Sequence, residues 1–254
     1  MRAAVFALFL LGATAPVVIG SGLDGTRATI PVQVDGRTER CVIDTGASVM
    51  LLSADAARNA GLQFGAPLEE IAPDGRRYAD YQTTITDFTA GSYTAHGMPA
   101  RISSNLPSNV ILCGYDFLSR VPTLIDRDHN QVTLFPATAA VDRMHCEPVD
   151  LTPRVPLGSI DVNGTKIGNV VLDSGATGGG VLWSGAGSNL TPAQYGMSCG
   201  QNAGIAFYDG GPVAQLQLCT SPQRPDGYNG LVETNLPTVH QIAIDYPNRR
   251  MCFQ

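Results

Sequence analysis

The chain has 254 residues, of which 44% are apolar and 15% charged, and its formal net charge is −6 at pH 7. The apolar fraction supports a packed core and excludes a disordered chain, and the acidic balance argues against a nucleic-acid-binding protein. The 28 Gly and 17 Pro residues favour a turn-rich β protein over one of long charged helices.

The N-terminus has the pattern of an export signal. A short positive start is followed by an uncharged run over residues 3–20. We expect a signal segment over residues 1–20 with cleavage after Gly20, because Pro16 obstructs the competing site before it, and we expect no stable membrane insertion afterwards. An uncleaved anchor is the alternative, since the run just reaches the length of a bilayer span. Export, most simply to a bacterial periplasm or the medium, would place the six cysteines in an oxidising compartment.

Two segments carry the same succession of strand, turn and strand. Residues 32–48 read VQVDGRTERCVIDTGAS, and residues 160–177 read IDVNGTKIGNVVLDSGAT. The Asp-Gly pair of the first and the Asn-Gly pair of the second each predict a two-residue hairpin. The turn Gly precedes the Asp of the motif by 8 residues in the first copy and by 9 in the second. Such self-similarity indicates an internal duplication.

A second element recurs later in each half. In the first half the apolar residues 110–113 precede Gly114, and we match this Gly to Gly230 in the second half. Both halves then end as an apolar strand, a polar turn and another strand. We therefore expect two lobes, at residues 21–140 and 141–254. Helix is expected only in short pieces, such as residues 53–61, where Ser53 is a suitable N-cap.

Each half places an aspartate where an apolar strand ends at a sharp turn. Asp44 follows Cys-Val-Ile and Asp173 follows Val-Val-Leu, and Gly46 and Gly175 permit a close approach of the backbone. A carboxylate at the end of a buried strand is costly unless it has a partner. If a pseudo-twofold axis relates the halves, the two loops meet on that axis and each Asp becomes the other's partner.

Such a pair has a defined chemistry. Two carboxyl groups a few ångström apart share one proton, so that one acts as a base on a bound water and the other polarises a carbonyl oxygen. Thr45 and Ser174 offer hydroxyls that bond to the opposite loop. The expected catalytic residues are Asp44 and Asp173, and no metal or cofactor is required.

The segment Val42–Ser48, with Ile111–Gly114 downstream, resembles the signature of retropepsin-like aspartic proteases. Its tandem repetition resembles the single-chain pepsin-like enzymes in a shorter form, over nearly all of the chain after the signal segment. The resemblance implies an all-β, bilobal fold with pseudo-twofold symmetry, a monomer, and endopeptidase activity on extended protein or peptide substrates. Two departures weaken the second half: Tyr228-Asn229 stand where apolar residues are expected, and residues 178–180 are all Gly.

The resemblance also suggests a flap and a set of disulfides. The flap, a hairpin that closes over the cleft, best matches residues 68–82, with Asp74 and Gly75 at its tip and Tyr78 or Tyr81 as its aromatic residue. The expected cysteine pairs, of which the first is the alternative to buried thiols, are Cys41 with Cys113, Cys146 with Cys252, and Cys199 with Cys219.

Other interpretations remain open or are set aside. A non-catalytic polypeptide-binding module on the same fold is the alternative function, motivated by the irregular second half. A half-site that works as a homodimer is unnecessary, because the second Asp lies in the same chain. Residues 196–200 fit the G-x-S-x-G nucleophile pattern but lack the strand and helix that this motif needs.

Overall fold

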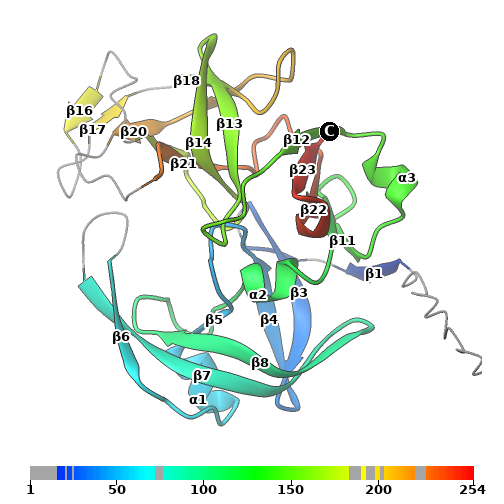
Figure 1. Cartoon of the computed structure of the whole chain (residues 1–254), viewed down its shortest axis with the longest axis vertical. Helices are drawn as coiled ribbons and strands as arrows, with labels where there is room; N and C mark the ends of the chain where they lie inside the picture. The colour runs from blue at the N-terminus through cyan, green and yellow to red at the C-terminus, as the bar shows by residue number, and fades with distance from the viewer. Residues whose placement is uncertain are drawn as a thin grey trace, which may run out of the picture.

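A computed structural model describes residues 16–20, 22–24, 26–71, 77–182, 190–192, 198–200, 203–220 and 227–254. Strands dominate it and form two lobes, each built around its own sheet, with a third sheet joining them (Figure 1). The predicted fold class is therefore confirmed. Most of the expected signal segment lies outside the described residues.

The first lobe is an eight-stranded sheet with strand order β2-β3-β4-β9-β5-β8-β7-β6. Ser53 ends one of these strands, and its side chain accepts a hydrogen bond from Ala56 N, which caps the short helix that follows as predicted. The elements are β2 (Gly22–Asp24), β3 (Arg27–Val34), β4 (Arg37–Ile43), β5 (Leu51–Ser53), α1 (Ala54–Asn59), β6 (Pro67–Ile71), β7 (Arg77–Ala90), β8 (Tyr93–Ser103), β9 (Ile111–Cys113) and α2 (Tyr115–Leu118).

The second lobe is a nine-stranded sheet with strand order β16-β17-β20-β15-β21-β14-β13-β18-β19. It occupies the upper half of Figure 1, opposite the first lobe. Its strands are β13 (Leu157–Val162), β14 (Thr165–Asp173), β15 (Gly180–Leu182), β16 (Leu190–Pro192), β17 (Ser198–Gly200), β18 (Ala203–Ala206), β19 (Ala214–Leu216), β20 (Leu218–Thr220) and β21 (Gly230–Glu233).

The third sheet has six strands in the order β1-β11-β10-β22-β23-β12 and takes segments from both halves of the chain. The halves meet where β10 pairs antiparallel with β22. Its elements, with the short helices between them, are β1 (Val17–Gly20), β10 (Thr123–Asp126), β11 (Gln131–Leu134), α3 (Thr138–Val141), β12 (His145–Pro148), β22 (Gln241–Asp245), η2 (Tyr246–Asn248) and β23 (Arg250–Phe253).

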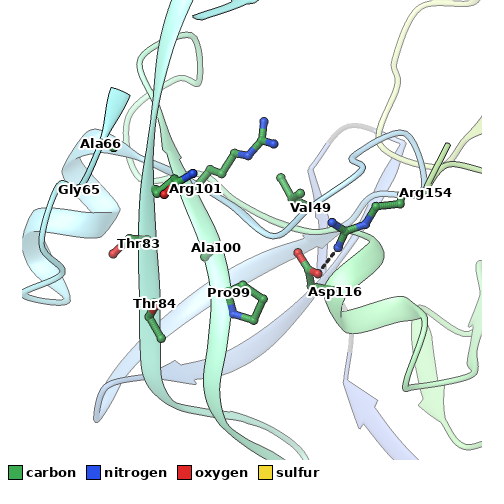
Figure 2. A pocket seen from close by; sticks show the side chains of 11 residues that line it. Val49, Gly65, Ala66, Thr83, Thr84, Pro99, Ala100, Arg101, Asp116 and Arg154 are labelled. Carbon is green, nitrogen blue, oxygen red and sulfur yellow. Dashed lines mark hydrogen bonds and ion pairs between the residues drawn. The ribbon is translucent and has the colours of Figure 1, made fainter. Parts of the chain in front are cut away.

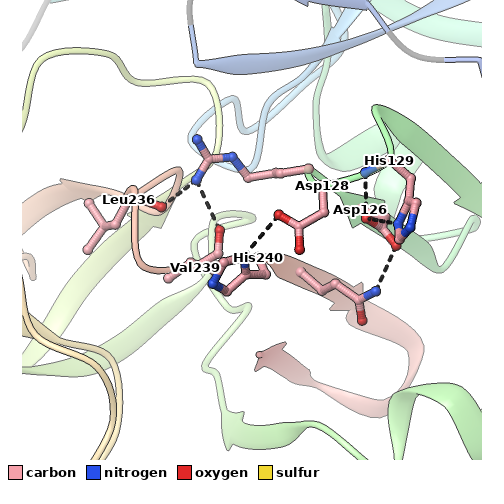
Figure 3. A network of polar contacts seen from close by, with 8 residues as sticks. Asp126, Asp128, His129, Leu236, Val239 and His240 are labelled. Atoms are coloured by element: carbon pink, nitrogen blue, oxygen red, sulfur yellow. Dashed lines mark hydrogen bonds and ion pairs between the residues drawn. The ribbon is translucent and has the colours of Figure 1, made fainter.

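Polar contacts reinforce this junction between the lobes. Arg127 follows β10, and its guanidinium donates to the carbonyl oxygen of Val239 at 3.0 Å and to that of Leu236. Figure 3 shows the neighbouring contacts, in which His240 lies 2.9 Å from Asp128. These contacts therefore join the two halves of the chain beside the pairing of β10 with β22.

Strand β1 bears on the expected processing site. Val17–Gly20 pairs antiparallel with β11, and Ile19 is buried in the core. Cleavage after Gly20 would remove this edge strand from the six-stranded sheet.

Both predicted hairpin turns have the backbone that their residues favour. Asp35 and Gly36 lie at φ 46° and 78°, and Asn163 and Gly164 at φ 52° and 82°. Positive φ at both central residues is typical of the two-residue turn that suits twisted strands. The register of β13 against β14 shifts between Gly158 and Ile160, where β14 has one extra residue. This residue explains why the turn Gly lies one residue farther from the Asp in the second copy than in the first.

The predicted match between Gly114 and Gly230 is wrong by three residues. In the first lobe Ile111 lies opposite Cys41, and in the second lobe Gly230 lies opposite Val170. Cys41 and Val170 precede Asp44 and Asp173 by the same number of residues, so Gly230 is equivalent to Ile111. The apolar pair of the second lobe is therefore Leu231-Val232. The position of Gly114 is occupied by Glu233, which lies beside Asp173 in the parallel pairing of β14 with β21.

The disulfides agree with the expected pairing. Cys41 is bonded to Cys113 and Cys146 to Cys252, which joins β4 to β9 and β12 to β23. Cys219 is disulfide-bonded as well, and the residue opposite it in the register of β17 and β20 is Cys199. In the part of the chain that the structure describes, no helix is both long and apolar enough to cross a membrane.

Candidate active site

The two Asp-containing loops meet between the lobes. A Cβ added to Gly46 would lie 2.3 Å from Asp173 Oδ2, and one added to Gly175 would lie 2.2 Å from Asp44 Oδ2. The backbone of each Gly is thus in contact with the carboxyl group of the Asp in the opposite loop. No other residue fits at either position without displacing an aspartate, which explains the need for Gly after each Asp-Thr or Asp-Ser.

Hydroxyl groups lock the loops together in a reciprocal pattern. Thr45 Oγ1 donates to the carbonyl oxygen of Leu172 at 2.6 Å, and Ser174 Oγ donates to that of Ile43 at 2.8 Å. In return Ser174 N donates to Thr45 Oγ1 at 2.8 Å, and Thr45 N donates to Ser174 Oγ at 3.1 Å. All of these groups are buried, so the network defines the separation of the two aspartates.

Backbone amides orient both carboxyl groups. Asp44 and Asp173 are only 7% and 8% exposed. Asp44 Oδ1 accepts from Ala47 N at 3.0 Å, while Asp173 Oδ1 accepts from Gly175 N at 2.7 Å and from Ala176 N at 3.1 Å. These bonds aim each side chain at the other loop.

Burial raises the pKa of both aspartates above the usual value of 3.8. For Asp44 the negative charge of Asp173 raises the pKa further, and the hydrogen bond between the two carboxyl groups acts in the same direction. For Asp173 the amides of Gly175 and Ala176 oppose the effect of burial and limit the rise in pKa. Both effects on Asp44 favour its protonated form beside Asp173.

Tyr246 lies near both aspartates, and no sequence pattern predicts its place there. Its hydroxyl donates to the carbonyl oxygen of Thr45 at 3.5 Å, and its ring lies 5.9 Å from that of Tyr115. Burial raises the pKa of Tyr246 well above its usual value, and the charges of Asp44 and Asp173 raise it further. This phenol is therefore a neutral donor that supports the first Asp loop.

A cavity of about 490 Å³ adjoins the loop that follows Asp44 (Figure 2). Asp116 lies on its wall, accepts from Met50 N at 3.1 Å and is paired with Arg154, which reaches it from the start of the second half. The Arg154 guanidinium also lies 5.0 Å above the ring of Tyr115. The ion pair thus ties the loop of one lobe to the other half of the chain.

A second cavity, of about 480 Å³, adjoins the loop that follows Asp173. Glu233 and Asn235 lie on its wall, together with residues 177–179. Asn235 Nδ2 donates to the carbonyl oxygen of Ser174 at 2.7 Å. A repeat alignment anchored on the apolar pair Leu231-Val232, rather than on Gly230, would have found both residues.

The hairpin expected to form the flap is partly described. β6 pairs with β7 along residues 67–71 and 77–81, while the predicted tip, Asp74 and Gly75, lies outside the described residues. Tyr78 lies opposite Glu70 in this hairpin. Burial raises the pKa of Tyr78, and the charges of Asp80 and Glu70 raise it further.

Comparison with known proteins agrees with this geometry. Residues 30–120 match the family model described as gag-polyprotein putative aspartyl protease. The aspartic proteinase from Irpex lacteus is 13% identical, with 94% of this chain and 97% of that chain covered and a TM-score of 0.59. Basic 7S globulin from soybean is 11% identical, with 94% and 96% covered and a TM-score of 0.57. No curated protein matches the chain.

The chain therefore has the two-lobed fold of the aspartic proteinases. Its first lobe carries the aspartyl protease family match, and the resemblance to retropepsin-like and pepsin-like proteases is confirmed.

Proposed function

We propose that the chain is an aspartic endopeptidase, with Asp44 and Asp173 as its catalytic dyad. The observation that carries this proposal is the mutual approach of the two Asp loops, in which each Gly lies against the opposite carboxyl group. Two inward-facing, buried carboxyl groups with raised pKa values are expensive to maintain for structure alone.

The proposed reaction is a direct attack by water on the peptide carbonyl. The ionised member of the dyad takes a proton from the water as it attacks, and the protonated member donates to the carbonyl oxygen. The resulting tetrahedral intermediate collapses when a proton passes to the leaving nitrogen. No covalent enzyme intermediate forms, and one proton remains on the dyad after each cycle. Thr45 and Ser174 keep the two carboxyl groups at their working separation.

The substrate class follows from the two lobes. The active loops lie between them, with a cavity beside each, and this arrangement suits an extended polypeptide. We also propose a monomer with lobes at residues 21–140 and 141–254, since one chain supplies both aspartates. The disulfides support export to an oxidising compartment, such as a periplasm.

The test is cleavage of a broad panel of unfolded proteins and peptides between pH 3 and 7, with and without a pepstatin-class inhibitor. Inhibitor-sensitive cleavage by the wild type is expected, and it should be abolished in Asp44→Asn and in Asp173→Asn while circular dichroism shows an unchanged fold. Full activity in either variant would refute the dyad. Absence of any inhibitor-sensitive cleavage would instead favour a non-catalytic polypeptide-binding module.

A further inference from the structure

Glu233 is a buried carboxylate next to the dyad that the proposed reaction does not use. It is 4% exposed. Its oxygens accept three hydrogen bonds: Oε2 from Gly178 N at 2.8 Å and from Gly179 N at 3.0 Å, and Oε1 from Thr26 Oγ1 at 2.7 Å. These donors come from two different lobes.

The equivalent position in the first lobe shows what Glu233 replaces. A Cβ added to Gly114 would lie 2.1 Å from the carbonyl oxygen of Val49 and 2.5 Å from that of Ala47. The loop after Asp44 therefore packs directly on Gly114. With Glu at the equivalent position, the loop after Asp173 requires another path and another support.

The run of Gly in the second lobe provides that path. Gly178 and Gly179 lie at φ +90° and +116°, a region that other residues rarely adopt. Their amides point at Glu233, and Glu233 N donates to the carbonyl oxygen of Gly179 at 3.0 Å. The Gly run expected to weaken the second half is thus matched to Glu233: the Gly residues fit the loop around the Glu, and the Glu satisfies their amides.

The contact with Thr26 extends this support across the lobes. Thr26 directly precedes β3 of the first lobe, and Arg154 precedes β13 of the second lobe at the equivalent place. Arg154 reaches Asp116 in the first lobe, and Thr26 reaches Glu233 in the second. Each half therefore sends one residue to the carboxylate that supports the other half's Asp loop.

We propose that Glu233 is a positioning residue for Asp173, which it acts on by clamping residues 177–179 to the first lobe through Thr26. The amides of Gly175 and Ala176 orient the Asp173 carboxyl group, and the Glu233 clamp holds the chain immediately beyond them. The effect of Glu233 on catalysis rests on the proposed function. Its effect on residues 177–179 does not.

The test compares Glu233→Gln and Thr26→Val with the wild type, using peptide hydrolysis and hydrogen exchange of segment 174–182. In Glu233→Gln the charge is lost, and an NH2 group that cannot accept from Thr26 replaces one oxygen, while the other oxygen still accepts from the two Gly amides. Loss of a hydrogen bond to a charged group predicts a fall in kcat of about tenfold or more, with KM changed less than about twofold. Exchange of segment 174–182 should become faster, and Thr26→Val should change both quantities in the same direction.

Thr26→Ser and Glu39→Gln are the matched controls. Thr26→Ser keeps the donor and should restore the wild-type kcat and exchange, which simple loss of packing would not explain. Glu39→Gln removes a carboxylate from β4 and should change neither quantity. Unchanged exchange in both Glu233→Gln and Thr26→Val overturns the inference, whether or not the chain proves to be a protease. Faster exchange with unchanged kcat in an active enzyme also overturns it, while leaving the proposed function intact.

Discussion

Replacement of Ser174 by Ala tests how the lobes hold the dyad. The Ser174 hydroxyl donates to the carbonyl oxygen of Ile43 and accepts from Thr45 N. All three residues are at most 1% exposed, so neither partner gains access to water when the hydroxyl is removed. Each buried group left without a partner costs about 1–3 kcal/mol. Allowing for some relaxation of the loops, we expect Ser174→Ala to lower the free energy of unfolding by about 2–4 kcal/mol.

The assay is urea unfolding followed by far-ultraviolet circular dichroism, together with kcat for peptide cleavage. Ser174→Ala should shift the unfolding midpoint to lower urea and also lower kcat, because the same bonds set the separation of the carboxyl groups. Ser174→Thr, which keeps the hydroxyl and copies the first lobe, is the control and should lose far less. Stability and activity equal to the wild type in Ser174→Ala would refute the reasoning, since the cross-lobe bonds would then carry no free energy.

Three further outcomes are expected. Because the pKa of Asp44 is raised above 3.8 in the folded state, stability decreases as the pH rises through that raised value; Asp44→Asn should therefore be more stable than the wild type at pH 7 and equal to it in urea melts well below pH 3.8. Replacing Cys41 and Cys113 together by Ala opens a link of sequence separation 72 and should cost about 4 kcal/mol in chemical unfolding, whereas no loss would mean that the link is dispensable. A chain that begins at Ser21 lacks β1 and should unfold at lower urea than one that begins at Val17, because β1 is part of the six-stranded sheet; equal midpoints would mean that β1 adds nothing to the sheet.

Local signals account for what could be predicted from the sequence. The Asp-Gly and Asn-Gly turns require only their own residues, and the structure has both with positive φ. The Asp loops were found because the repeat places the same short motif in each half. The pairing of the loops then followed from the symmetry of the duplication, while the bilobal fold and the disulfide between Cys146 and Cys252 followed from the resemblance to pepsin-like enzymes.

Contacts between distant segments account for what could not be predicted. The role of Glu233 cannot be predicted from the repeat, because the first half has Gly114 at the equivalent position. Tyr246 had no counterpart to reveal it, since Arg127 stands at the equivalent place after β10. The pairing of β1 with β11 could not be predicted either, because the apolar composition of residues 17–20 names no partner strand. In each case the deciding interaction joins residues far apart in the chain.

The six-stranded sheet has a consequence for the order in which the protein is made. β10 belongs to the first half, but its partner β22 and the neighbouring β23 are synthesised only after the strands of the second lobe. A nascent first half would therefore expose one edge of β10, a template for unwanted strand pairing, until β22 emerges. Vectorial folding, one lobe at a time, cannot complete this sheet. A chain that crosses a membrane unfolded and folds only after β22 and β23 have emerged avoids the exposed intermediate, and loss of these two strands would remove the sheet that both lobes share.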